Sequence, residues 1–258
     1  MPTRRHKKTL QEVDLMDSER LIAALDVPTL KEAENLVETL KPLGITFKVG
    51  LELFYSEGPA VVKIIQSHGC KVFLDSKFHD IPNTAAGASR AAARMGVFMY
   101  NVHTSGGIEM MKCASDAARE EAHKLGKVPP KILGVTVLTS IDNTVLREQL
   151  SITKKLEDQV AFQAHLAQKA GLDGVVASPK EIGLIRKECG PNFLIVTPGI
   201  RPQDSSLDDQ QRVMTPRQAA IQGADYIVVG RPITKAQDPY NSALAIVKEF
   251  EEGLKKHE

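Results

Sequence analysis

Eight short runs of apolar, often β-branched residues alternate with longer segments of helical periodicity along most of this 258-residue chain. The runs occupy residues 21–26, 46–50, 72–75, 98–102, 132–138, 174–177, 193–197 and 226–229. Their interiors, such as VFL, ILGVTVL and YIVV, are almost continuously apolar, which is typical of parallel strands covered on both faces. The alternation therefore predicts an α/β fold built on a parallel sheet.

A helix candidate accompanies each run. The candidates occupy residues 29–40, 58–68, 83–94, 109–124, 156–170, 179–188, 216–222 and 239–250. Eight strand–helix units in about 230 residues match a single (β/α)8 TIM barrel. An open, doubly wound sheet is the alternative. It is disfavoured because the turn after the first strand reads LDVPTL and has no GxGxxG pattern.

The chain shows no linker and no shift in composition, so we expect one barrel domain over residues 20–250. Residues 1–19 are charged and lack the apolar core of a signal peptide, which predicts a flexible N-terminal arm. Residues 251–258 are expected to fray as a C-terminal tail. No apolar stretch approaches the length of a membrane span, so we expect no membrane partner.

The charge balance argues against polyanionic partners. Lys and Arg number 33 and Asp and Glu 32, a net charge of +1, so no global field would hold nucleic acid or a membrane surface. Any phosphate must be bound locally. Cys70, Cys113 and Cys189 are widely spaced, which suits a reducing environment and predicts a cytoplasmic protein.

Catalytic groups of a barrel lie at the carboxyl ends of its strands. Asp26 ends the first run, Lys48 lies near the end of the second, and Asp75 ends the third, followed by Lys77 and Asp80 in FLDSKFHDIPNT. An extended backbone would point Asp75 and Lys77 to the same side. An ion pair at about 4 Å and an effective dielectric near 20 is worth roughly 4 kcal/mol, which would keep the lysine cationic as a proton donor. The alternative is a solvated, charged loop rim.

Two later segments suggest an anion site. Gly230 and Arg231 follow the last strand in VVGRPI, where barrels often bind phosphate through backbone N–H groups and a guanidinium. The long segment VTPGIRPQDSSLDDQQRVMTP has the profile of an active-site lid, and its Arg201 and Gln210 could close on an anion. The alternative for Gly230 and Arg231 is a tight turn with a solvent-facing arginine.

Other polar residues at strand ends carry less weight. His103 ends the fourth strand, where a lone histidine is more often structural than basic. Thr139 and Ser140 end the fifth strand, where their hydroxyls could contact a polar ring edge or cap the next turn. No metal site is expected, because the two lysines would repel a divalent cation and the carboxylates have cationic partners.

The segments LIAALD, FKVG, LDSKFHDIPNT, VTVLTS, TPGIRPQ and VVGRPI together resemble the orotidine 5′-phosphate decarboxylase family. The resemblance covers about residues 20–248, and the DxKxxDIxNT run is highly specific. It implies a TIM-barrel enzyme of de novo UMP synthesis that acts on a nucleotide without a cofactor. Lys77 would be the catalytic lysine, and Lys48, Asp75 and Asp80 would complete its charged network.

The resemblance also implies a homodimer with shared active sites. Asp80 and Ile81 would reach into the partner's site, and Thr84 would contact the neighbouring subunit's ribose. The remaining substrate contacts would be Asp26 and Lys48 at the ribose, Thr139 at the pyrimidine, and Arg201, Gln210, Gly230 and Arg231 at the phosphate.

Two other functions stay open at this stage. Sugar-phosphate decarboxylases and aldolases of the same barrel, such as 3-keto-L-gulonate 6-phosphate decarboxylase and hexulose-phosphate synthase, use a DxKxxD run with Mg²⁺. They carry a glutamate at the position of Lys48, so this lysine favours the metal-free reaction. A non-catalytic barrel that binds a phosphate ligand is the other alternative, and the complete charged set argues against it.

Overall fold

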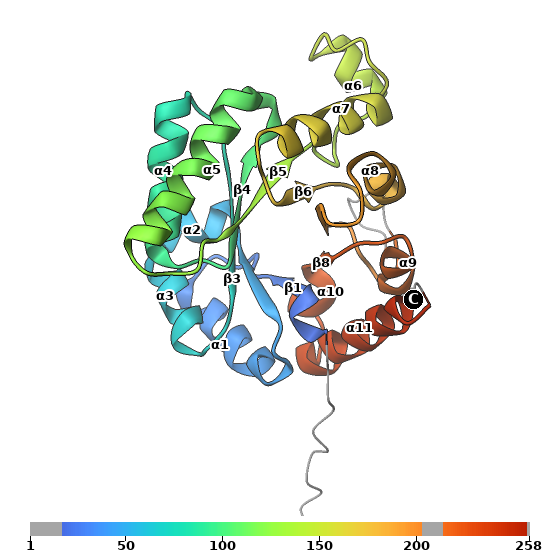
Figure 1. Ribbon diagram of the computed structural model, residues 1–258. Helices are drawn as coiled ribbons and strands as arrows, with labels where there is room; N and C mark the ends of the chain where they lie inside the picture. Colours follow the sequence, from blue (N-terminus) through green and yellow to red (C-terminus); the bar gives the residue numbers. More distant parts are fainter. Residues whose placement is uncertain (1–16, 203–213, 257–258) are drawn as a thin grey trace, which may run out of the picture.

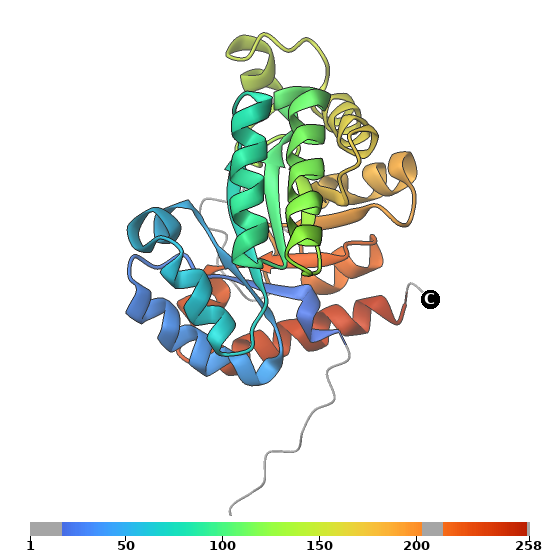
Figure 2. The same cartoon turned by 60° about the vertical axis from the view of Figure 1, so that its left-hand side comes forward.

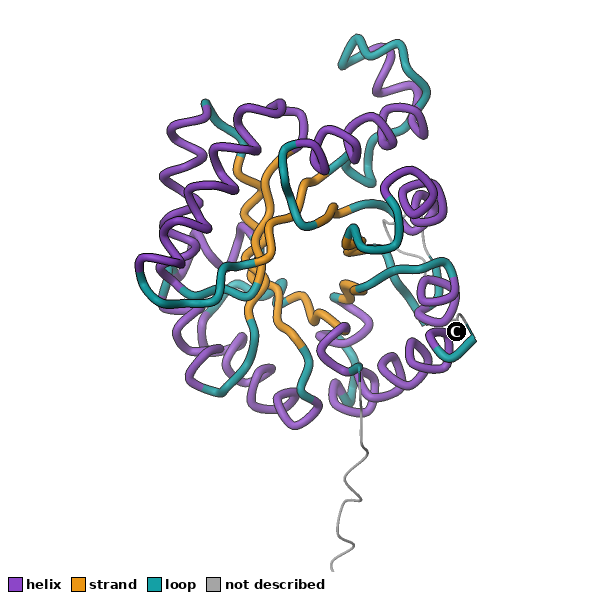
Figure 3. Tube along the Cα trace, viewed as in Figure 1, coloured by secondary structure: helices purple, strands orange, loops and turns teal. Residues whose placement is uncertain are grey.

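Eight parallel strands close into a barrel in the computed structural model, which describes residues 17–202 and 214–256 (Figures 1 and 3). The strands are β1 (Leu21–Ala24), β2 (Thr46–Val49), β3 (Val72–Phe78), β4 (Met99–His103), β5 (Lys131–Val135), β6 (Gly174–Val176), β7 (Leu194–Thr197) and β8 (Tyr226–Val229). Each strand pairs with its successor in the sequence, and β8 pairs with β1. The predicted TIM barrel is therefore confirmed, and the open sheet is wrong.

Helices surround the barrel as the periodicity predicts. They are α1 (Leu30–Leu40), α2 (Leu51–Glu57), α3 (Ala60–Ser67), α4 (Pro82–Met95), α5 (Gly107–Lys124), α6 (Asn143–Glu148), α7 (Leu156–Lys169), α8 (Ile182–Cys189), α9 (Pro216–Ile221), α10 (Arg231–Thr234) and α11 (Pro239–Leu254). Short 3-10 turns η1 (Ser18–Arg20), η2 (Lys41–Leu43), η3 (Thr104–Gly106) and η4 (Pro179–Glu181) lie between them. The short helices α2, α6 and α10 are additions to the prediction. Helix α6 projects away from the barrel in both views (Figures 1 and 2).

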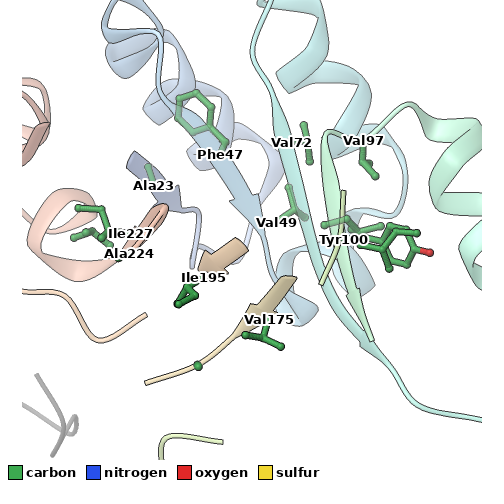
Figure 4. Close-up of a cluster of buried hydrophobic side chains, with 14 of the residues drawn as sticks. Ala23, Phe47, Val49, Val72, Val97, Tyr100, Val175, Ile195, Ala224 and Ile227 are labelled. Atoms are coloured by element: carbon green, nitrogen blue, oxygen red, sulfur yellow. The ribbon is translucent and has the colours of Figure 1, made fainter. Parts of the chain in front are cut away.

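The core has two parts because each strand buries both of its faces. Side chains that point outward, such as Phe47, Tyr100 and Ile195, form a continuous cluster between the strands and the helices (Figure 4). Side chains that point inward, such as Phe73 and Met99, form a second cluster that fills the barrel. Fully burying one large apolar side chain contributes about 1.5–3 kcal/mol, so both clusters hold the strand ends in place.

Helices α4 and α5 lie side by side over the outside of the barrel (Figure 2). Small residues are prominent among their buried positions, with Ala85, Ala92 and Ala93 on α4 and Ala114 and Ala118 on α5. Small side chains let the two helices pack closely. The packing fixes the start of α4, which follows directly from the charged end of β3.

Regular structure begins before residue 20 and continues beyond residue 250, the expected limits of the barrel. Of the predicted arm, residues 1–16 lie outside the described residues, whereas Ser18 is buried in η1 and the Glu19 carbonyl accepts a hydrogen bond from Thr46 Oγ1 at 2.9 Å. Helix α11 extends four residues beyond its expected end at Phe250. Gly253 packs there against α9, so closely that a Cβ would lie 2.5 Å from the Arg217 carbonyl oxygen.

No helix within the described ranges is both long enough and apolar enough to cross a membrane.

Candidate active site

Four charged side chains of alternating sign meet at the carboxyl ends of β1, β2 and β3. Lys77 Nζ lies 2.6 Å from Asp75 Oδ1, and Lys48 Nζ lies 3.3 Å from Asp75 Oδ2. Lys48 Nζ also lies 3.2 Å from Asp26 Oδ1. Asp75 is thus held between two ammonium groups, and Lys48 between two carboxylates. We call Asp26, Lys48, Asp75 and Lys77 the charged cluster.

A bulge in β3 creates the closest of these contacts. Leu74 pairs with Tyr100 and Phe78 with Val102, so β3 uses two more residues than β4 over this stretch. Within the bulge Lys77 has a left-handed backbone with φ of 49°, a conformation that costs on the order of 1–3 kcal/mol for a non-glycine residue. Asp75 and Lys77 are therefore brought together by an irregular backbone, and the extended strand assumed from their spacing is wrong.

Asn101 of β4 connects the backbone and the side chains of the bulge. The Lys77 backbone N–H donates to Asn101 Oδ1 at 2.7 Å. Asn101 Nδ2 donates to Asp75 Oδ1, also at 2.7 Å. The sequence analysis missed this residue because a single amide in an apolar strand belongs to no motif. Its only signal is its position two residues after the inward-facing Met99.

The cluster keeps Asp75 and Lys48 ionised. Burial alone would raise the pKa of Asp75, but the charges of Lys48 and Lys77, with hydrogen bonds from Lys77 and Asn101, hold it below its ordinary value. Burial alone would lower the pKa of Lys48, but the carboxylates of Asp75 and Asp26 hold it above its ordinary value. At neutral pH, Asp75 is therefore a carboxylate and Lys48 an ammonium.

A cavity of about 200 Å³ opens beside Asp75 and Lys77. Its wall is mainly apolar, apart from Lys48, Asp75, Lys77, Thr139 and Ser178. The lining residues are Lys48, Phe73, Asp75, Lys77, Val135, Val137, Leu138, Thr139, Val176, Ala177, Ser178, Pro198 and Val228. A flat apolar ring with polar edges suits such a wall. Ser178 and Pro198 are lining residues that the sequence analysis did not select.

A second cavity, of about 420 Å³, adjoins the first, since Lys48, Pro198 and Val228 line both. Asp26 lines it at one side. The residues beyond are Gly199, Ile200, Arg201, Gly230, Arg231, Pro232 and Lys235. Three cationic side chains therefore lie at the end farther from Lys77, where an anionic group of a ligand would be held.

Local contacts shape this cationic end. Arg201 is buried, and its backbone N–H donates to the Met214 carbonyl at 3.0 Å. The two ends of the expected lid are thus joined, although residues 203–213, and with them Gln210, lie outside the described residues. Gly230 lets the chain pass close to the charged cluster, because a Cβ there would lie 3.3 Å from Asp26 Oδ2. Arg231 follows at the start of α10.

A comparison with known protein families identifies the family of this chain. The model of the Orotidine 5′-phosphate decarboxylase / HUMPS family matches residues 19–246. The chain belongs to this family.

Relatives within the family are similar over almost the whole chain. A protein of Moorella thermoacetica named orotidine 5′-phosphate decarboxylase is 54% identical over 243 residues, which cover 94% of this chain and 96% of the relative. One of the same name from Syntrophotalea carbinolica is 50% identical, covering 92% and 97% of the two chains. The crystal structure of orotidine 5′-phosphate decarboxylase from Lactobacillus acidophilus is 40% identical and superposes with a TM-score of 0.80, covering 89% of this chain and 98% of that one.

Three residues of the family motif lie outside the charged cluster of their own chain. Asp80, Ile81 and Thr84 are exposed around the start of α4. The Asp80 carboxylate accepts the Ile81 backbone N–H at 2.7 Å, and among the described residues it forms no ion pair with Lys77 or Lys48. The apolar side chain of Ile81 is 67% exposed. In the single chain, these three residues are therefore exposed to solvent.

Thr139, Ser140 and His103, the other polar residues at strand ends, have different surroundings in the structure. Thr139 is half-buried and lines the first cavity, whereas Ser140 is exposed. His103 is half-buried, and its ring lies 5.3 Å from that of His79 between centroids. Burial, with the charges of His79 and Lys77, lowers the pKa of His103 below its ordinary value. It borders the charged cluster, and among the described residues it makes no hydrogen bond to a member of the cluster.

One group of potential metal ligands occurs in the part of the chain that the structure describes. Glu34 and Glu38 on α1 lie near His68 at the end of α3. Lys41 Nζ lies 3.2 Å from His68 Nδ1, which places a cation beside the group. None of these residues lines the two cavities of the decarboxylase-family site.

Proposed function

We propose that the chain decarboxylates orotidine 5′-phosphate to UMP and CO2, and that Lys77 donates the proton that C6 of the pyrimidine receives. The observation that carries this proposal is the contact between Lys77 and Asp75 at the wall of the apolar cavity, at 2.6 Å. The family and the names of the relatives supply the substrate.

The chemistry needs a cation close to C6. Breaking the bond between C6 and the carboxylate carbon leaves an electron pair in the ring plane, where the ring carbonyls cannot delocalise it. The Lys77 ammonium stabilises this charge and then transfers a proton from Nζ to C6, while CO2 leaves. The mainly apolar wall of the cavity provides a low local dielectric, which strengthens this electrostatic interaction.

Asp75 acts mainly in the ground state. Because its carboxylate stays ionised, it repels the substrate carboxylate, and the repulsion disappears as neutral CO2 forms. Its second task is to hold Lys77 in position by the direct ion pair. Lys48 balances the charge of Asp75 and joins it to Asp26, so that Asp26 and Lys48 can bind the ribose hydroxyls together.

The phosphate binds at the cationic end of the second cavity in this proposal. Arg231 offers a guanidinium there, Gly230 a backbone N–H, and Arg201 a second guanidinium. Gln210, on the segment outside the described residues, would complete this end. Binding energy from the phosphate orients the pyrimidine in the adjoining cavity, where Thr139 contacts the ring.

We further propose a homodimer in which each site is shared. Asp80 and Ile81 are exposed at the mouth of the barrel, and Thr84 lies one turn further along α4. In an isologous dimer these residues reach the partner's cavity, where Asp80 adds a carboxylate beside Lys77. The exposed Ile81 side chain supplies apolar surface for such an interface.

We also propose a cytoplasmic location, which the free thiols support. Cys70, Cys113 and Cys189 are all free in the described structure, which suits the reducing cytoplasm. The substrate is a small nucleotide, and the net charge of +1 gives no reason to expect binding to nucleic acid.

The direct test is to incubate the purified protein with orotidine 5′-phosphate, with and without EDTA, and to follow the loss of the orotate chromophore. We expect conversion to UMP at the same rate in both samples. No conversion would overturn the proposed reaction. Loss of activity in EDTA would instead support the Mg²⁺-dependent chemistry of the sugar-phosphate enzymes, which the Lys48 ammonium beside Asp75 disfavours.

A further inference from the structure

Asn101 lies inside the barrel, directly behind the charged cluster. It is fully buried on β4, between Tyr100 and Val102, which both point outward to the helices. Met99, two residues earlier, belongs to the cluster that fills the barrel, so Asn101 points inward one level higher. It lines neither of the two cavities.

The two hydrogen bonds of Asn101 fix the orientation of its amide. A backbone N–H can only donate, so the Lys77 N–H must face the amide oxygen, at 2.7 Å. An ionised carboxylate can only accept, so Asp75 Oδ1 must face the amide nitrogen, at 2.7 Å. An amide side chain meets both needs, because it carries an acceptor and a donor on two separate atoms.

The side chain also replaces missing sheet contacts. Between Leu74 and Phe78 the pairing of β3 with β4 is interrupted by the bulge. The Asn101 amide oxygen takes the place of a backbone carbonyl for the Lys77 N–H. This hydrogen bond helps to hold Lys77 in its unfavourable left-handed backbone conformation.

Asn101 limits the rotation of the Asp75 carboxylate as well. Oδ1 accepts from Asn101 Nδ2 and from Lys77 Nζ, while Oδ2 faces Lys48. With both oxygens engaged on opposite sides, the carboxylate has one favourable orientation. Lys77 is then held at two places: its backbone N–H is bound by Asn101, and its ammonium group is bound by Asp75. Both contacts help to direct the ammonium toward the cavity.

We propose that Asn101 is a positioning residue for the decarboxylation, which holds the Lys77 backbone and the Asp75 carboxylate so that the ammonium faces C6 of the substrate. This inference rests on the proposed function, because it assigns a role to Asn101 only through Lys77 and Asp75. A buried polar residue with a purely structural role would support folding without affecting turnover by the folded enzyme.

Two variants of Asn101 and one control separate these roles. Asn101→Leu has the same branched shape, although it is larger, and removes both hydrogen bonds. Asn101→Asp keeps an acceptor for the Lys77 N–H but removes the donor to Asp75. The control is Tyr100→Phe, on the same strand, which removes the buried hydrogen bond from the Tyr100 hydroxyl to the Ala114 carbonyl and keeps the ring. For each variant, kcat is measured per UMP-binding site, with the Kd of UMP by calorimetry and the thermal unfolding midpoint.

We expect both Asn101 variants to lose at least about tenfold in kcat, because a misplaced catalytic group slows the reaction. The Kd of UMP should stay within about threefold of the wild type, because Asn101 lines neither cavity. Tyr100→Phe should retain the wild-type kcat. A fall in kcat of less than tenfold for a folded Asn101 variant would overturn the inference. If Asn101→Leu does not fold, Asn101→Asp decides by the same limit. An inactive wild-type enzyme would contradict the proposed function instead, so the two failures are distinct.

Discussion

The Lys77 ammonium lies 2.6 Å from the Asp75 carboxylate within one bulged strand. Lys77 and Asp75 are thus two residues apart on one strand and do not come from separate loops. Their geometry depends on the bulge in β3 and on the hydrogen bonds that Asn101 of β4 makes to both residues. The proposed catalytic pair is therefore positioned by the barrel strands themselves.

The ionised state of Asp75 predicts a pH-dependent stability. Its pKa is lowered in the folded chain, whereas unfolding returns it to about 3.9. Ionised Asp75 therefore adds to the free energy of unfolding above that pH, and the contribution is lost as the pH falls through the lowered, folded-state pKa. Asp75→Asn should be less stable than the wild type at pH 7, and the difference should shrink as the pH falls from about 5 to 3.

Urea unfolding at several pH values measures this difference. Asp116→Asn, at an exposed position on α5, is the matched control and should stay within about 0.5 kcal/mol of the wild type at pH 7. A difference for Asp75→Asn that does not change with pH would show that the carboxylate charge contributes nothing to folding.

The cationic end of the second cavity predicts a selective loss of phosphate binding. Arg231→Ala should weaken the binding of UMP by roughly 1.5–3 kcal/mol, the value of a charge-assisted hydrogen bond, and leave the binding of uridine almost unchanged. Isothermal titration calorimetry gives both affinities. Arg217→Ala, which removes a surface ion pair with Glu252, is the control and should affect neither ligand. Equal losses for UMP and uridine would mean that Arg231 is structural.

The shared site predicts complementation between inactive chains. Lys77→Ala and Asp80→Ala should each be inactive, but a heterodimer has one site that takes Lys77 from one chain and Asp80 from the other. After gentle dissociation and reassociation of equal amounts, activity should recover to about a quarter of the wild type, because half the dimers carry one intact site of two. A tag pull-down verifies that subunits have exchanged. Exchange without recovered activity would place Asp80 in its own chain's site.

The strands and the charged cluster were predictable for the same physical reason. Parallel strands buried on both faces are continuous apolar runs, and their carboxyl ends meet at one rim. Charged residues directly after such runs, as at Asp26, Lys48 and Asp75, must therefore lie near one another. The residues 203–213, which include Gln210, lie outside what the structure describes.

Three features could not be predicted in this way. The bulge of β3 depends on side-chain support from another strand, so the sequence around Lys77 alone reads as an extended strand. Asn101 supplies that support from a run of apolar residues that carries no motif. Helix α2 was missed because Gly58 and Pro59 divide its segment from α3, leaving only seven residues of helix.

The central claim is that the Lys77 ammonium supplies the charge and the proton at C6, and turnover by Lys77→Ala tests it most directly. The variant and the wild type are compared for loss of the orotate chromophore, for UMP binding and for thermal unfolding, with the exposed Lys180→Ala as control. We predict no measurable turnover by Lys77→Ala, with a cooperative unfolding transition and retained UMP binding, and full turnover by Lys180→Ala. Activity of Lys77→Ala close to that of the wild type would contradict the account.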